Sequence, residues 1–164
     1  MTETESVISV VIPVFNEEDN LAALIGRLQP VLRSLGRPYE IVMIDDGSRD
    51  GSLAILKDLV RENPELRVVE LTRNYGQHAA IMAGFSIVRG DIVVTLDADL
   101  QNPPEEIPRL VAEMENGGYD VVGTIRRRRR DSAFRLGASR LINIVARRIT
   151  GVHMTDWGCM LRAY

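Results

Sequence analysis

The sequence predicts an α/β fold with an open, mostly parallel sheet flanked by helices. Short apolar runs alternate with longer stretches in which apolar residues recur at helical spacing. The short runs are nearly continuous in apolar residues, which is typical of parallel strands covered on both faces. The chain has 164 residues, of which 45% are apolar and 26% are charged. This length and balance are typical of one globular domain, which we expect to span residues 1–164.

Five apolar runs are the expected strands: Val7 to Val14, Glu40 to Ile44, Arg67 to Leu71, Asp91 to Leu96 and Asp120 to Gly123. Four helices are expected between and after them: Leu21 to Leu35, Ser52 to Glu62, Gln77 to Val88 and Asn102 to Gly117. Pro30 should kink the first helix, and Asn102 is the expected cap of the fourth. Sheets of this kind bind ligands beyond the carboxyl ends of their strands, so functional residues are expected there.

Neither a membrane span nor a secretory leader is predicted. The longest apolar run, around residues 7–15, is broken by Ser9 and Pro13 and is far shorter than the roughly 20 residues of a span. Residues 1–6 are acidic and polar, and we expect them to be flexible. The expected location is therefore the cytoplasm. The single cysteine, Cys159, can form no internal disulfide and is expected to be a small buried residue.

The net charge of −3 conceals a strong asymmetry. The segment Arg126 to Arg148 holds nine arginines and one acid, Asp131, so its charge is +8 and the rest of the chain carries −11. We expect this segment to meet an anionic partner. The planar guanidinium favours a phosphate. No nucleic-acid partner is expected, because Phe134 is the only aromatic residue available for base stacking in the segment.

Acidic or polar clusters follow three of the expected strands, at residues 16–18, 45–46 and 97–101. Turn and cap chemistry explains each cluster equally well when it is taken alone. Together they would bring at least four carboxylates into one crevice, where a cation must neutralise them. Asp97, Asp99 and Gln101 alternate, so in an extended segment they would point to the same side. Their oxygens suit Mg²⁺ or Mn²⁺, which keep positions open for substrate phosphates.

Three motifs resemble those of the inverting glycosyltransferases of family 2. They are Val11–Glu17 (VIPVFNE), Asp45–Gly51 (DDGSRDG) and Asp97–Gln101 (DADLQ), in this order. Two further segments, Asn74–Gly84 and Asp97–Val111, look like the polyprenyl-phosphate glycosyltransferase branch of that family. The resemblance covers about residues 7–164 and implies the GT-A fold, which is Rossmann-like. It also implies a C-terminally truncated chain, because members of that branch continue beyond the position of Tyr164 with membrane-docking elements.

The activity that the resemblance implies is metal-dependent, inverting sugar transfer. The donor would be a nucleoside-diphosphate sugar of the UDP-linked 4-amino-4-deoxy-arabinose type, and the acceptor undecaprenyl or another polyprenyl phosphate at the cytoplasmic membrane face. One alternative is an inactive nucleotide-sugar-binding module that docks on a membrane or partner. Others are a transferase with a different donor, similar to dolichol-phosphate-mannose synthase or a glucosyl transferase, and a family 2 enzyme with a sugar acceptor.

Residue roles are also carried over from the resemblance. The donor-binding residues would be Pro13, Phe15, Glu17, Asp45, Asp46 and Asp97. The metal would be held by Asp99 and Gln101, with Asp97 beside them. Arg126, Arg135 and Ser139 would bind the lipid phosphate, next to a mobile acceptor loop at residues 126–131. Asp99 and Asp156 are the candidate catalytic residues, although Asp156 is equally well explained as a turn cap.

The region after that loop has the pattern of a basic amphipathic helix. Apolar residues recur at helical spacing from about Ser132 to Gly151, with arginines elsewhere on the helix surface. Such a helix either presents a solvated face or lies at an anionic membrane surface, and both alternatives stay open.

Overall fold

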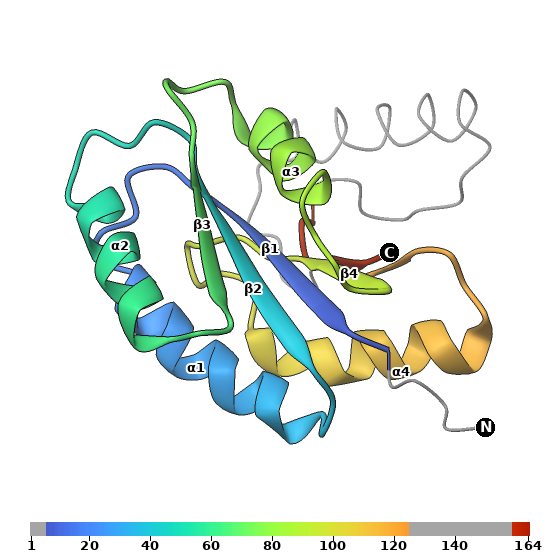
Figure 1. Ribbon diagram of the computed structural model, residues 1–164. Coiled ribbons are helices and arrows are strands. Elements are labelled where there is room, and N and C mark those ends of the chain that lie inside the picture. Colours follow the sequence, from blue (N-terminus) through green and yellow to red (C-terminus); the bar gives the residue numbers. More distant parts are fainter. Residues whose placement is uncertain (1–5, 125–158) are drawn as a thin grey trace, which may run out of the picture.

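The computed structural model describes residues 6–124 and 159–164. In these ranges a six-stranded sheet lies between helices, as Figure 1 shows. The strands are β1 (Ile8–Val14), β2 (Tyr39–Asp45), β3 (Leu66–Glu70), β4 (Ile92–Thr95), β5 (Val122–Gly123) and β6 (Arg162–Ala163). The helices are α1 (Leu21–Ser34), α2 (Ser52–Glu62), α3 (Gln77–Phe85) and α4 (Ile107–Gly117), with the short 3-10 helix η1 (Pro104–Glu106) before α4. No helix in the described ranges is long and apolar enough to span a bilayer.

The order of the strands in the sheet is β3-β2-β1-β4-β6-β5. The first four are parallel neighbours, and β6 runs antiparallel between β4 and β5. The predicted mostly parallel α/β sheet is therefore confirmed. From β1 the chain builds β2 and β3 on one side and β4 on the other, so the order reverses between β1 and β4. In open α/β sheets, the crevice at the carboxyl end of such a switch point is where ligands bind.

The two faces of the sheet are buried by different helices. On one face, Val10, Ile12 and Val14 of β1 join a large core with apolar residues of α1, α2 and α4. On the other face, Val11 packs with Val42, Ile44 and Ala80, and Ala80 belongs to α3. This alternation follows from the two-residue period of a strand. Figure 1 shows α3 on the opposite side of the sheet from α1 and α4.

Helix α3 approaches the sheet most closely at Gly84. A Cβ atom at this position would lie 2.5 Å from Val11 Cγ1 and 2.9 Å from Ile44 Cδ1. Both distances are shorter than atoms tolerate, so only a residue without a side chain allows this packing. The close approach matters for function because α3 begins with Gln77, whose side chain reaches the carboxyl end of β4.

Three features of the local structure differ from the sequence analysis, one strand that it missed and two expectations that are wrong. The short strand β6 was not expected, because two residues carry too little periodic signal. Asn102 does not cap a helix: α4 begins at Ile107, and the Asn102 side chain is buried. The segment from Asp97 to Gln101 is not extended. After β4 ends at Thr95, the chain turns at residues 98–99, and Leu100 has a φ of 61°.

Candidate active site at the carboxyl ends of the strands

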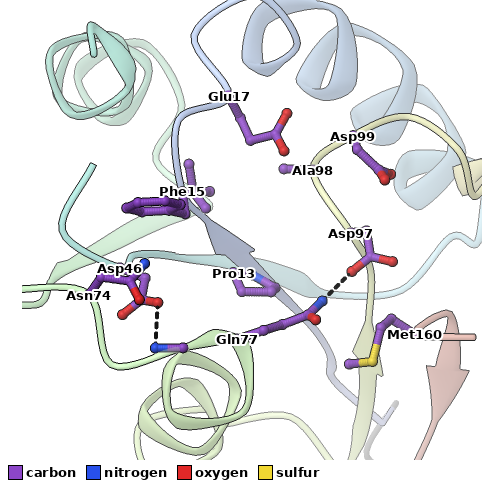
Figure 2. Close-up of a pocket in the computed structure, with 12 residues that line it drawn as sticks. Pro13, Phe15, Glu17, Asp46, Asn74, Gln77, Asp97, Ala98, Asp99 and Met160 are labelled. Atoms are coloured by element: carbon purple, nitrogen blue, oxygen red, sulfur yellow. Dashed lines mark hydrogen bonds between the residues drawn. The ribbon is translucent and has the colours of Figure 1, made fainter. Parts of the chain in front are cut away.

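A pocket of about 370 Å³ opens where β1, β2 and β4 end (Figure 2). Its lining comes from the end of β1, the start of α3, four loops and the C-terminal segment: Pro13, Val14, Phe15, Glu17, Asp46, Asn74, Gly76, Gln77, Asp97, Ala98, Asp99 and Met160. The pocket thus occupies the switch point between β1 and β4, where the strand order predicts a ligand. It brings together carboxylates from three separate sequence clusters, as the strand-end argument predicted.

Four of these lining residues carry carboxylates: Glu17, Asp46, Asp97 and Asp99. Two residues predicted beside them are placed elsewhere. Asp45 is 1% exposed and does not line the pocket; its Oδ2 accepts a hydrogen bond from the Ser48 N–H. Gln101 is exposed and also outside the pocket. The turn at residues 98–99 explains this placement, because it removes the alternating register that would have put Gln101 beside the two aspartates.

The loop after β1 is held by the loop after β2. The Asn16 N–H donates to Ser48 Oγ at 3.0 Å, and Asn16 Oδ1 accepts from the Arg49 N–H at 2.8 Å. The Glu17 N–H donates to the buried Ser52 Oγ at 2.8 Å. Asn16 has a φ of 56°, a conformation that asparagine tolerates better than most residues. These bonds fix the backbone that presents Phe15 and Glu17 to the pocket.

Asp50, in the loop after β2, is a further acceptor in this network. It accepts hydrogen bonds from the Ser52 and Glu18 N–H groups. Burial opposes its charged form, but these backbone bonds and the Ser52 side chain outweigh that effect and hold the pKa of Asp50 below its usual value. A charged Asp50 therefore keeps the two loops together at neutral pH.

Asp46 holds the loop in front of α3. Its Oδ1 accepts the Tyr75 N–H at 2.7 Å, and its Oδ2 accepts the Gly76 N–H at 2.9 Å. The side chain is almost fully buried although it borders the pocket. Gly47 next to it has a φ of 69°, and a Cβ there would lie 2.6 Å from the Asn74 nitrogen. The two loops are therefore packed backbone to backbone at this wall of the pocket.

Asp97 is held by amide groups on both sides. Gln77 Nε2 donates to its Oδ1 at 2.6 Å, as Figure 2 shows, and Asn102 Nδ2 donates to its Oδ2 at 3.1 Å. The neighbouring Asp99 accepts the Gln101 N–H through Oδ1 at 3.0 Å. The orientation of the Asp97 carboxylate is thus fixed by α3 and by the loop before η1.

The sequence over nearly its whole length matches a family model described as glycosyl transferase family 2, at residues 9–161. The chain belongs to glycosyltransferase family 2. A relative is the undecaprenyl-phosphate 4-deoxy-4-formamido-L-arabinose transferase of Aeromonas hydrophila, which is 60% identical over 158 residues. The match covers 96% of this family 2 chain and 48% of the relative. The chain spans about half the length of the curated relatives it matches.

Solved structures of glycosyltransferases share this architecture. Glucosyl-3-phosphoglycerate synthase from Mycobacterium tuberculosis, in complex with UDP, matches with a TM-score of 0.71 and 27% identity. The match covers 96% of this chain and 56% of that one. A mannosyltransferase from Pyrobaculum calidifontis, in complex with GDP-Man and Mn²⁺, matches with a TM-score of 0.63 and 23% identity, over 77% of this chain and 37% of that one. These likenesses support the predicted GT-A fold.

The fold implies a divalent cation, and the pocket offers part of a site for one. Within residues 6–124 and 159–164, no three His, Cys, Asp or Glu side chains are grouped so that they could hold a metal ion. Asp97 and Asp99 do line the same pocket. Mg²⁺ is commonly bound by one or two carboxylates together with substrate phosphates. Two carboxylates in one pocket therefore fit a cation that is bound together with a diphosphate.

The predicted acceptor-binding residues Arg126, Arg135 and Ser139 lie outside the described residues, as do the candidate catalytic residue Asp156, the predicted loop 126–131 and the basic helix. Among the lining residues outside the three motifs, sequence reasoning assigned no role to four: Asn74, Gly76, Gln77 and Met160. A usable signal existed for the first three, because they follow the third strand and are polar or glycine. Met160 carried no such signal, since its position depends on how β6 joins the sheet.

Proposed function

We propose that this family 2 chain binds a nucleoside-diphosphate sugar with Mg²⁺ or Mn²⁺ in the described pocket and transfers the sugar to a polyprenyl phosphate. The observation that carries the proposal is the convergence of Glu17, Asp46, Asp97 and Asp99 in one pocket at the switch point of the sheet. A sugar nucleotide brings two phosphates, and a cation reconciles their charge with that of the protein. The relatives' name supports undecaprenyl phosphate as the acceptor and an arabinose-type sugar.

The donor is proposed to lie across the carboxyl ends of β1 and β4. Pro13 and Phe15 offer apolar surface to the nucleoside, and Phe15 is 40% exposed, which leaves it available for stacking on a base. Asp97 and Asp99 would hold the cation and, through it, the diphosphate, with Asp97 also near the ribose. Asp46 supports the opposite wall through its bonds to the loop before α3.

The proposed chemistry is a displacement at the anomeric carbon with inversion. An oxygen of the acceptor phosphate forms the new bond while the bond to the nucleoside diphosphate breaks, and the electron pair leaves with the diphosphate. When bound, the cation neutralises the charge that develops on this leaving group. The second pKa of a phosphate monoester is about 6, so the acceptor is largely ionised at neutral pH and needs no strong base. Asp156 would position the acceptor or act as a base.

The acceptor side of the proposal rests on the arginine segment and on the relatives. Arg126, Arg135 and Ser139 would bind the lipid phosphate, and the segment's charge of +8 would favour an anionic membrane surface. The proposed location is therefore the cytoplasmic face of the membrane, with the chain bound peripherally.

Calorimetric titration of the chain with UDP, with and without Mn²⁺, tests the donor part of the proposal. We expect binding that depends on Mn²⁺ and that weakens about tenfold, or about 1.4 kcal/mol, in Asp99→Asn, because the amide loses the charge that holds the cation. Asp58→Asn, an exposed acid on α2, is the matched control and should bind like the wild type. If no UDP- or GDP-sugar binds with Mn²⁺, the proposal is wrong.

A transfer assay then separates the proposed enzyme from a binding module. The chain is mixed with vesicles that contain undecaprenyl phosphate, and nucleotide sugars that raise its melting temperature in the presence of Mn²⁺ are offered as donors. Sugar in the lipid fraction supports transfer, and Arg135→Ala should lower this transfer while UDP affinity is kept. Binding without any lipid product would favour the inactive module instead.

A further inference from the structure

Asn102 lies behind the pocket and joins it to the C-terminal segment of the chain. It is 5% exposed and does not line the pocket. Its Nδ2 donates to Asp97 Oδ2 at 3.1 Å, and its Oδ1 accepts a hydrogen bond from the thiol of Cys159 at 3.4 Å. Cys159 is 1% exposed and also lies 2.9 Å from Thr124 Oγ1. A row of polar groups thus runs from Thr124 through the buried Cys159 and Asn102 to the Asp97 carboxylate.

The positions of the donor hydrogens decide in which direction the hydrogen bonds of this row run. Asp97 as a carboxylate only accepts, so the Asn102 nitrogen must face it and the amide oxygen must face Cys159. The thiol proton then goes to that oxygen, and the Thr124 hydroxyl is free to donate to sulfur or to the Leu161 carbonyl. The hydrogen bonds from the thiol to Asn102 and from Asn102 to Asp97 therefore both point toward the pocket. Polarised in one direction, such bonds strengthen one another.

The groups that hold the Asp97 carboxylate come from segments far apart in the sequence. Gln77 comes from the start of α3, Asn102 from the loop before η1, and Cys159 from the residues that precede β6. Pairing of β6 with β4 and β5 places Cys159 beside Asn102. The buried Thr95 hydroxyl adds a bond to the Met160 carbonyl, which holds the same segment against β4. The orientation of one pocket carboxylate is thus linked to the docking of the C-terminal strand.

We propose that Asn102 is a positioning residue for Asp97, and that Cys159 holds the Asn102 amide in the orientation this requires. The last torsion of an aspartate is broad, so a carboxylate without fixed donors samples many orientations. If the carboxylate is fixed before the ligand arrives, binding no longer carries the entropic cost of ordering it. This inference rests on the proposed function, because it is the bound cation and diphosphate that need a fixed Asp97.

The experiment measures the Kd of UDP in the presence of Mn²⁺ and the melting temperature without ligand, for the wild type and four variants. Asn102→Leu keeps the side-chain volume and removes the amide; we expect UDP to bind about tenfold more weakly, as is typical when the partner of a metal ligand is lost. Cys159→Ala should weaken binding in the same direction. Cys159→Ser should restore it, because a hydroxyl can donate to the Asn102 oxygen as the thiol does.

Leu161→Ala is the matched control, because Leu161 is buried in the same segment and the same core as Cys159 but its side chain makes no hydrogen bond. It should lower the melting temperature and leave the Kd unchanged. If the wild type binds neither UDP nor, in the same assay, GDP, the proposed function fails, whatever the variants do. If the wild type binds and Cys159→Ala and Cys159→Ser bind equally well, or if Leu161→Ala weakens binding as much as Cys159→Ala, the positioning role is overturned. The Cys159 pair decides this even if Asn102→Leu does not fold.

Discussion

Asp45 and Asp46 are adjacent and chemically identical, yet the fold gives them different tasks. Asp46 lines the pocket and accepts two backbone N–H groups from the loop before α3, whereas Asp45 lies under the surface at the end of β2. From sequence, both were predicted to bind the donor. The distinction depends on where the loop at residues 73–76 lies, and that loop is at least 27 residues further along the chain. The sequence around Asp45 and Asp46 therefore cannot show which of the two lines the pocket.

Replacing Asp46 by alanine tests this supporting role. The Tyr75 and Gly76 N–H groups would lose a charged acceptor in a buried place, and such bonds contribute about 1.5–3 kcal/mol each. We expect the free energy of unfolding to fall by at least about 1.5 kcal/mol, and the amide hydrogens of residues 75 and 76 to exchange faster. Urea unfolding and hydrogen exchange measure the two effects. Unchanged exchange at both amides would contradict the role.

At the scale of single elements, the packing of α3 on the sheet yields a sharp comparison. A Cβ at Gly84 would overlap Val11 and Ile44, so Gly84→Ala should cost about 1–3 kcal/mol through overpacking. That cost opposes the gain of up to about 1 kcal/mol that alanine brings to a helix interior. Gly26→Ala in α1 has no atom within 4 Å of its Cβ and should keep the whole gain. Thermal unfolding of both variants should therefore shift in opposite directions, and an equal rise in both would refute the close packing of α3.

The elements themselves were largely predictable because their signal is local. The strands β1 to β4 and all four helices lie within the expected ranges to within a few residues, and the apolar periodicity that marks them is read directly from the chain. The features that the sequence analysis missed or predicted wrongly depend on tertiary contacts. β6 exists because β4 and β5 flank it, and Asn102 is buried by the segment that contains Cys159 rather than used as a cap. The arrangement of Asp97 and Asp99 was predicted for a wrong reason, since a turn and not an extended register brings them to the pocket.

At the scale of the whole molecule, the parallel strands separate two polar regions. The pocket lies at their carboxyl ends, and a buried network around Glu40 lies near their amino ends. Glu40 Oε1 accepts the Ser9 hydroxyl at 2.7 Å and the Arg89 N–H at 2.6 Å, and its Oε2 accepts from Arg67 at 2.9 Å. These bonds tie β1, β2 and β3 to the segment that leads into β4. Glu40 therefore stabilises the sheet and is not part of the candidate active site.

The network predicts how the stability of the molecule changes in acid. Burial opposes the charge of Glu40, but its hydrogen bonds to Ser9, Arg89 and Arg67 outweigh this and hold its pKa below the usual value. A carboxyl whose pKa is lowered by folding stabilises the protein above its unfolded pKa of about 4.3, and this contribution disappears as the pH falls through the folded pKa. Glu40→Gln should therefore be less stable than the wild type at pH 7, because its amide nitrogen faces donors. The difference should shrink below about pH 4.3, where the protonated carboxyl resembles the amide.

Urea unfolding of the wild type and Glu40→Gln at several pH values from 7 to 3 measures this difference directly. Glu113→Gln, at an exposed position of α4, is the control for the general loss of a negative charge. We expect the control to follow the wild type within about 0.5 kcal/mol, as surface substitutions usually do. For Glu40→Gln, hydrogen bonds to a charged group set the expected loss at pH 7 at about 1.5–3 kcal/mol. A difference that stays constant down to pH 3 would mean that the Glu40 charge does not hold the strands together, because only a charge-dependent contribution vanishes on protonation.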